Sequence, residues 1–210
     1  MAEMSMNRII HGAFRRDLAR FENGLATLAD GDTRRAQQLS AAWANFEHQL
    51  TIHHKSEHAI AWPALRRVGI SDELTTKWDG EHEKMAAALS TADGAMRALR
   101  DTVSSQNIAA ARSAITELRT VALEHLEHEE ADLEPFLLSH KGNPDLRAMG
   151  RQMGREYKLP EAGVFFAWLQ DGASPEEKAA LRKEVPPPVV AMLTRVFGGK
   201  YRRTVAATWR

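Results

Sequence analysis

The sequence contains HHKSEHAIAWPAL at residues 53–65 and, at an offset of 72, HLEHEEADLEPFL at residues 125–137. Both stretches hold a His followed four residues later by a Glu, with a Pro six residues beyond that Glu. Two further stretches, HGAFRRDL at residues 11–18 and HEKMAAAL at residues 82–89, correspond at an offset of 71. The chain therefore contains an internal repeat of two units, and each unit supplies one His followed by a His–Glu pair.

Apolar residues around these stretches recur at steps of three and four, which is the spacing of one face of an α-helix. Breaks at residues 30–32, between Pro63 and Ser71, and at residues 101–107 divide the pattern into four helices. Asp93-Gly94 indicates a kink or an early end inside the third helix. Because the links are short, we expect an all-α fold, an up-down-up-down four-helix bundle. The four faces are His11, Phe14, Leu18, Phe21, Leu25 and Leu28; Leu39, Trp43, Phe46, Leu50, His53, Glu57 and Ile60; Trp78, His82, Met85, Leu89, Ala92, Met96 and Leu99; and Ile108, Ala111, Ile115, Leu118, Ala122, His125 and Glu129.

The last third of the chain differs in composition from the rest. Residues 1–140 carry 15 basic and 21 acidic side chains, whereas residues 141–210 carry 13 and 7. This shift in composition predicts that the chain has two parts, the bundle at 1–140 and a short-helix C-terminal extension at 141–210. Their opposite charges fit packing of the extension on the bundle. Helices in the extension are expected to begin at Asn143-Pro144, Leu159-Pro160 and Ser174-Pro175, with a last apolar segment at 189–197.

Six repeated polar side chains fall on the apolar faces of the four predicted helices. Each His lies between 20 and 22 residues from the turn that joins its helix to its partner, so the rise of ~1.5 Å per residue places all six in one layer at one end of the bundle. Any one of them alone would suit a hydrogen-bonded core residue or a helix-surface pair. Each polar group left unpaired in a dry interior would cost about a few kcal/mol. Two metal ions would satisfy them, and nitrogen and oxygen ligands without thiolate suit iron or manganese, with zinc possible and redox chemistry favouring iron. The predicted ligands are His11, His53, Glu57, His82, His125 and Glu129.

Other polar residues lie near the six in the sequence but outside the repeated pattern. His54, His58 and His128 are expected mainly on the surface, with a second role as partners of the ligands. Asp132 lies one step beyond Glu129 and is a further candidate to bind metal or orient a ligand. His48 and His140 are expected in solvent.

Composition and motifs exclude several classes of function. The chain has no Cys, which excludes disulfides, a thiol nucleophile and thiolate-bound metal sites. Its formal charge of zero argues against bulk binding of nucleic acid or anionic membrane. No run approaches the ~18 apolar residues of a membrane span and no signal peptide is seen at the N-terminus, so we expect a cytoplasmic protein. Glu-x2-His of ferritin-like oxidases, HExxH of zinc proteases, a glycine-rich phosphate loop and a Ser nucleophile elbow are absent from the sequence.

Over residues 5–140 the chain resembles the hemerythrin-like proteins with an HHE cation-binding domain. The resemblance rests on His11, on HHKSE with WPAL, on EHEKM, and on EHLEHEE with EPFL. It implies a non-haem di-iron centre, oxo- or hydroxo-bridged, with the four predicted histidines as terminal ligands and Glu57 and Glu129 as bridging carboxylates. The chain departs from the oxygen-carrying members in two places. Ala86 stands where the third helix of those proteins has a fifth His, and Glu129 follows His125 at x3 where they have His-x4-Asp.

The missing fifth His predicts an open centre and favours the members linked to peroxide or nitric oxide chemistry. We therefore expect catalase-like decomposition of hydrogen peroxide, with no catalytic residue beyond the metal ligands. The alternatives are a module that binds or senses oxygen or nitric oxide, and a store or donor of iron for the repair of iron centres. The extension is expected to close the metal end of the bundle, where Tyr157 or Tyr201 could reach the metals.

Overall fold

A computed structural model describes residues 3–210, and every regular element in that range is helical. The predicted all-α class is therefore confirmed. No helix within the described range is long and apolar enough to cross a membrane. The elements are α1 (Met6–Ala26), α2 (Thr33–Ser56), the π-helical segment η1 (Glu57–Ala61), α3 (Trp62–Val68), α4 (Asp72–Asp101), α5 (Ser105–Ser139), α6 (Pro144–Arg155), α7 (Leu159–Gln170), α8 (Pro175–Glu184), α9 (Pro187–Phe197), α10 (Gly199–Thr204) and the short 3-10 segment η2 (Ala206–Trp209).

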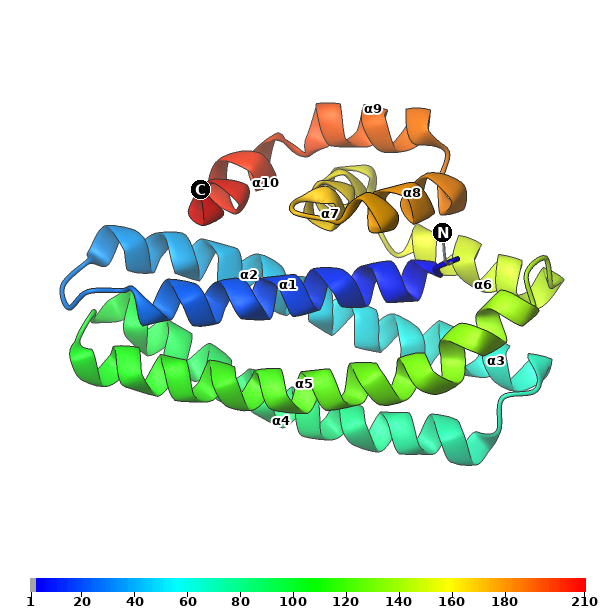
Figure 1. The fold of residues 1–210 in the computed structure, drawn as a ribbon, viewed down its shortest axis with the longest axis horizontal. Coiled ribbons are helices and arrows are strands. Elements are labelled where there is room, and N and C mark those ends of the chain that lie inside the picture. Colours follow the sequence, from blue (N-terminus) through cyan, green and yellow to red (C-terminus); the bar gives the residue numbers. More distant parts are fainter. Residues whose placement is uncertain (1–2) are drawn as a thin grey trace.

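Four long rods, α1, α2 with its continuation through α3, α4 and α5, lie side by side along the long axis of the molecule, and each runs opposite to the one before it (Figure 1). Helix α5 packs against α4 and α1, and α2 packs against α4 and α1. The apolar faces expected from the sequence are buried between the rods, except that Leu89 is half-buried. Burial of these faces is the main source of stability for such an arrangement.

The breaks between helices differ from those expected in two places. Pro63 does not end the second rod, because η1 runs directly into α3 and the helix continues through this residue. The rod ends instead at Gly69, whose φ of 126° suits glycine. Helix α4 also runs through Asp93-Gly94 without a break, and Asp93 accepts a hydrogen bond from the indole nitrogen of Trp43 at 3.1 Å.

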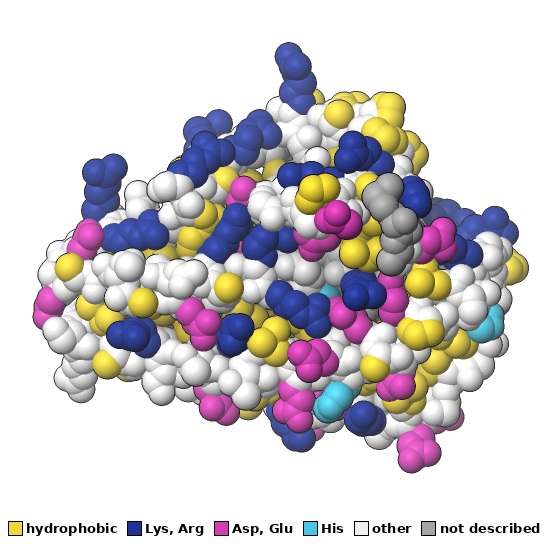
Figure 2. Space-filling model, viewed as in Figure 1, with side chains coloured by type: hydrophobic (Ala, Val, Ile, Leu, Met, Phe, Trp, Pro, Cys, Tyr) yellow, Lys and Arg dark blue, Asp and Glu magenta, His cyan; other side chains and the backbone are white. Residues whose placement is uncertain are grey.

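The extension covers one side of the rods. Helices α7 and α9 pack on each other, and α7 and α8 both pack on α1 (Figure 1). Asn143 and Ser174 cap α6 and α8 as predicted, whereas α7 is capped by Lys158 because Leu159 is already helical. Lys and Arg side chains gather over this part of the molecule in the space-filling view (Figure 2).

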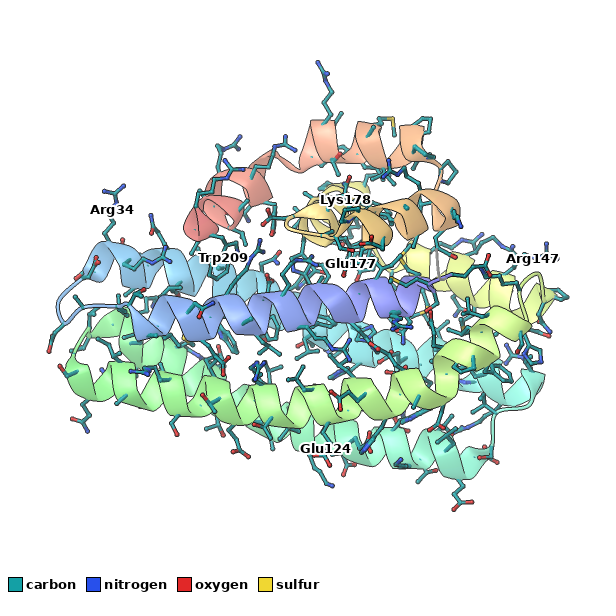
Figure 3. The ribbon with its side chains drawn as sticks, viewed as in Figure 1. Arg34, Glu124, Arg147, Glu177, Lys178 and Trp209 are labelled. Atoms are coloured by element: carbon teal, nitrogen blue, oxygen red, sulfur yellow. The ribbon has the colours of Figure 1, made fainter. Side chains whose placement is uncertain are left out.

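The contact between extension and rods is tight. Glu177 and Trp209 extend from the extension toward the rods (Figure 3). The ring of Trp209 lies 5.2 Å from that of Phe21 in α1, centroid to centroid. Glu177 lies so close to α1 that a Cβ at Gly12 would meet its carboxylate, so a larger residue there would require this side chain to shift.

A buried hydrogen-bond network anchors the extension to α1. The indole nitrogen of Trp168 donates to Asp17 at 2.7 Å, and Arg20 donates to Asp17 at 3.1 Å and to Asp171 at 3.3 Å. The hydroxyl of Tyr201 donates to Asp171 at 3.0 Å. Tyr201 therefore belongs to this anchor, and the expectation that it could reach the metals finds no support in its contacts.

Replacing Asp17 should test this anchor. We expect Asp17→Ala to lower the free energy of unfolding by about 2 kcal/mol, because it leaves the buried indole N–H of Trp168 without an acceptor. Asp17→Asn keeps an acceptor oxygen and should cost clearly less. Urea unfolding at neutral pH measures both, and equal losses in the two variants would contradict the role assigned to this hydrogen bond.

The pH dependence of the same pair provides a second readout. Burial raises the pKa of Asp17, against the opposing effects of Trp168 and Arg20. The folded state then holds a proton that the unfolded state releases, so the contribution of Asp17 falls as pH rises from its unfolded to its folded pKa. Asp17→Asn should remove this fall from the stability profile.

Candidate metal centre

The six predicted side chains meet in one layer. His11 comes from α1, His53 from α2, Glu57 from η1, His82 from α4, and His125 and Glu129 from α5. All six are buried. We expected the layer at one end of the rods, and this position is wrong. Helix α4 begins at Asp72 and α5 continues to Ser139, so both helices extend well beyond the layer.

Short distances join the six into one network. The Nε2 atoms of His53 and His11 are 3.3 Å apart, and those of His82 and His125 are 3.1 Å apart. Glu129 lies 3.4 Å from Nε2 of both His11 and His125. Glu57 lies 3.2 Å from Nε2 of His53 and 3.5 Å from Nε2 of His82.

Two groups of ligand atoms form within this network, each with its atoms inside 4.8 Å of one another. One group comprises His11, His53, Glu57 and Glu129, and the other comprises His54, His82 and His125. Each carboxylate also contacts a His of the second group, so the two groups share Glu57 and Glu129.

The sequence pattern placed His54 mainly on the surface, with a second role as a partner of the ligands, and the structure has it half-buried beside His82. Its ring stacks on that of His82 with centroids 4.1 Å apart and planes 17° apart. The adjacent pair His53-His54 was the available signal, but neighbouring helix positions point about 100° apart. Only the crossing of α2 and α4 brings the second ring into the layer. A fifth imidazole from α2 therefore lies beside the second group, whereas Ala86 on α4 is exposed.

The π-helical segment begins at Glu57, one of the six predicted ligands. The backbone N–H of Trp62 bonds to the carbonyl of Glu57, five residues earlier, in place of the usual four. This wider turn rotates the following residues, so that Trp62 is buried with its ring stacked against His82 at 5.8 Å. Single π turns inside α-helices are frequent at functional sites.

Several buried atoms in this layer have no hydrogen-bond partner within the described residues. They are both carboxylate oxygens of Glu57, one oxygen of Glu129 and Nε2 of His54. Buried polar atoms are normally satisfied, so this concentration of acceptors in one place requires a partner. Facing imidazole nitrogens and unpaired carboxylates form a donor set that fits divalent metal ions.

Two further carboxylates hold the outer nitrogens of the histidines. Nδ1 of His11 lies 3.0 Å from Glu130, and Nδ1 of His125 lies 3.0 Å from Glu81, which also bonds to His128 at 2.9 Å. A carboxylate on Nδ1 fixes the tautomer that presents Nε2 to a metal. Glu81 and Glu130 were not predicted, because their role depends on which residue faces each ring across a helix interface.

The charges of the buried groups are strongly perturbed. Burial and the neighbouring histidines lower the pKa of His53 well below its usual value. Burial and the adjacent Glu129 raise the pKa of Glu57 well above its usual range. The pKa of Glu129 is well below its usual range, because the effect of burial is outweighed by the adjacent imidazoles of His11 and His125. An imidazole binds metal in its neutral form, and a proton on Glu57 competes with metal for the carboxylate.

The remaining candidates lie outside the layer. His58 is exposed and bonds to Asp79 at 3.1 Å, and Asp132 is exposed. His48 is exposed as expected, whereas His140 is half-buried and stacks on Phe136 at 4.2 Å. Tyr157 lines a cavity that also reaches His53 and Glu57.

Comparison with known proteins agrees with this geometry. The family model described as the hemerythrin HHE cation binding domain matches residues 8–156, a span that holds every residue of both ligand groups. No curated protein and no solved structure shows significant similarity to the chain. Because the family model covers well over half of the chain, the resemblance seen in the sequence is confirmed: the chain belongs to the hemerythrin HHE cation-binding domain family.

Proposed function

We propose that the chain is a non-haem di-iron protein that decomposes hydrogen peroxide. The observation that carries this proposal is the pair of ligand groups that share Glu57 and Glu129. In the reaction, two molecules of peroxide give one of dioxygen and two of water, and a bound iron pair supplies the Lewis acidity and the redox capacity for it.

The chain's own residues have distinct tasks in this proposal. Glu57 and Glu129 would contribute to holding both ions. His11 and His53 would complete the ligands of one ion, and His54, His82 and His125 would complete those of the other. Glu130 and Glu81 retain the protons on Nδ1 of His11 and His125, which keeps both Nε2 atoms directed inward. The cavity that reaches His53 and Glu57 admits a small reactant.

The same proposal includes the domain organisation expected from the sequence. The four rods of residues 1–140 would form the up-down-up-down bundle that holds the metals, and residues 141–210 would form the extension packed on it. The antiparallel course of the rods and the anchor at Asp17 support this division.

Oxygen evolution tests the proposed reaction. Protein loaded with iron should release dioxygen from hydrogen peroxide, measured with an oxygen electrode, whereas protein loaded with zinc should not, because zinc has no accessible redox change. Iron-loaded protein that releases no more dioxygen than zinc-loaded protein would disprove the peroxide reaction.

The position of His54 favours a second candidate function, the binding or sensing of oxygen or nitric oxide. With His54, five imidazoles surround the layer, in groups of three and two. This number equals that of the oxygen-carrying members, in which the fifth His comes from the third helix. A reversible change in the optical spectrum with either gas, without peroxide turnover, would support this function over the first.

His54→Gln should separate the two ligand groups. We expect the affinity for one of two metal equivalents to fall by about tenfold or more, while the other equivalent is retained, because His54 belongs to only one group. His48→Gln is the matched control, since His48 is exposed on the same helix. Metal titration of both variants measures this, and unchanged binding in His54→Gln would show that His54 is not a ligand.

A further inference from the structure

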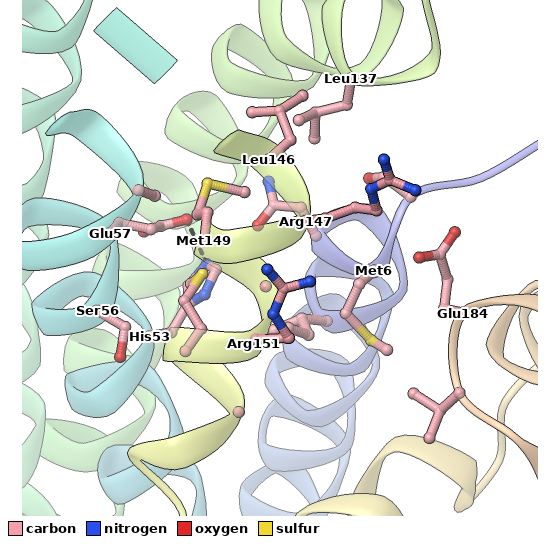
Figure 4. Close-up of a pocket in the computed structure, with 18 of the residues that line it drawn as sticks. Met6, His53, Ser56, Glu57, Leu137, Leu146, Arg147, Met149, Arg151 and Glu184 are labelled. Atoms are coloured by element: carbon pink, nitrogen blue, oxygen red, sulfur yellow. Dashed lines mark ion pairs between the residues drawn. The ribbon is translucent and has the colours of Figure 1, made fainter. Parts of the chain in front are cut away.

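A cavity of about 630 Å³ lies between α6 and the rods (Figure 4). Its inner lining includes Gln49, His53 and Glu57, and most of the remaining wall is apolar. Ligand-binding sites of proteins have volumes of about 300 to 1,000 Å³, so this cavity can hold an organic molecule of moderate size. Hydrogen peroxide needs only a small part of that space.

Helix α6 forms one wall of the cavity. The lining residues Leu146, Met149, Gly150, Met153 and Gly154 have the spacing of a single helix face. An amphipathic helix normally buries its apolar face, yet no residue of α6 is buried. A Cβ at Gly150 or Gly154 would meet nothing within 4 Å. Leu146, Met149 and Met153 are half-buried, because one part of this face packs against the cluster around Trp62 and Trp78. The other part borders the cavity, where a bound molecule could cover it.

Basic groups lie on the outer part of the lining. Arg147 and Arg151 are exposed and extend from successive turns of α6 at the cavity (Figure 4). Lys141 pairs with Glu3 at 2.9 Å, whereas the guanidinium groups of Arg147 and Arg151 form no ion pair or hydrogen bond with the described residues 3–210. The acidic side chains of the lining are Glu57 at the inner part and Glu184 from the end of α8.

We propose that this cavity binds a long-chain carboxylic acid. The carboxylate would pair with the guanidinium groups of Arg147 and Arg151, which bind carboxylates in a bidentate geometry. The hydrocarbon chain would lie against the apolar face of α6 and extend toward His53 and Glu57. The reverse orientation would remove the carboxylate from both guanidinium groups. This site requires no peroxide chemistry, and it places an apolar chain beside the metal centre.

Calorimetric titration with dodecanoate, below its micelle concentration, tests the proposal on the full chain freed of metal and again after loading with zinc. We expect one molecule to bind per chain in both states. Dodecyltrimethylammonium, which has the same chain and the opposite charge, should bind at least about tenfold more weakly. Because neither state contains iron, the outcome does not depend on the proposed peroxide reaction. Absence of dodecanoate binding would overturn the inference.

Two variants with matched controls locate the site. Gly150→Leu should abolish binding, because its side chain enters the cavity, and it should not harm the fold, because leucine favours a helix more than glycine does. Gly94→Leu is its control, since Gly94 is exposed in α4 and also has open space around its Cβ position. Binding as tight in Gly150→Leu as in Gly94→Leu, with unchanged circular dichroism, would place the ligand elsewhere and overturn the proposal.

The basic pair is tested separately. The double variant Arg147→Gln/Arg151→Gln should weaken dodecanoate binding by about tenfold and leave the binding of neutral dodecanol unchanged. Arg155→Gln is the control, because Arg155 lies on the same helix but outside the lining. Equal weakening of both ligands would contradict the assignment of the carboxylate to these guanidinium groups.

Discussion

Removal of metal should lower the free energy of unfolding by about 4 kcal/mol, if the metal is present at about 1,000 times its dissociation constant. For a chain of this length, that corresponds to a fall of roughly 10 °C in melting temperature. The effect follows from the buried oxygens of Glu57 and Glu129 and Nε2 of His54, which have no partner within the described residues. The unfolded chain holds no such arrangement of ligands, so the metal stabilises the folded state.

Thermal melts of the iron-loaded or zinc-loaded protein, of the chelated protein and of the chelated protein after metal is restored measure this difference. Glu124→Gln is a suitable control, because Glu124 is exposed on the helix that carries His125 and Glu129. The melting temperature of this variant should differ between the loaded and metal-free states by as much as that of the native chain. Identical melting temperatures in the two states of the native chain would show that the layer holds no metal.

Replacing Glu57 by Gln should have opposite effects on metal binding and on the stability of the metal-free protein. Glu57 contacts both ligand groups, so Glu57→Gln should weaken the binding of both ions, by about 100-fold or more. In the metal-free state, the same change removes a carboxyl group buried beside Glu129. We expect it to raise the free energy of unfolding at neutral pH by about 2 kcal/mol, as do other replacements of a buried charge.

The size of this second effect depends on pH. Burial and Glu129 raise the pKa of Glu57, so the folded state holds a proton that the unfolded state releases. The stability of the native metal-free protein therefore falls as pH rises from the unfolded to the folded pKa, and Glu57→Gln lacks this fall. Below the unfolded pKa the two proteins should differ little. A variant that is less stable than the native chain, without metal and at neutral pH, would indicate that Glu57 has a purely structural role.

Much of the fold was predictable because its main determinant is local. The steps of three and four in the four apolar faces require only that each helix bury one side, and those faces are buried. The positions of breaks were less predictable, since they depend on surroundings. Pro63 lies just after η1, where the helix continues without a break, and Asp93 is retained in α4, where it accepts a hydrogen bond from Trp43 across the interface.

The candidate site was likewise predictable only in part. The internal repeat marked His11, His53, Glu57, His82, His125 and Glu129, because polar residues on a buried face are visible in a sequence. The contribution of His54 depends on how α2 crosses α4, and that of Glu81 and Glu130 on which ring each faces. The cavity beside α6 was not predicted, because the helix has an ordinary amphipathic pattern and only its neighbours determine that its apolar face borders a hollow.

Neither half of the internal repeat can assemble a ligand group by itself. The first group combines α1, α2 and η1 with Glu129 from α5, and the second combines α4 and α5 with His54 from α2. During folding, an ion can be captured fully only after the two hairpins have met, so metal uptake should report on the docking of the hairpins and not on the formation of either one. If the repeat arose by duplication, a precursor with a single hairpin would have had a complete site only when two copies paired. Fusion of the two would then have turned an intermolecular cofactor site into one that no longer depends on protein concentration.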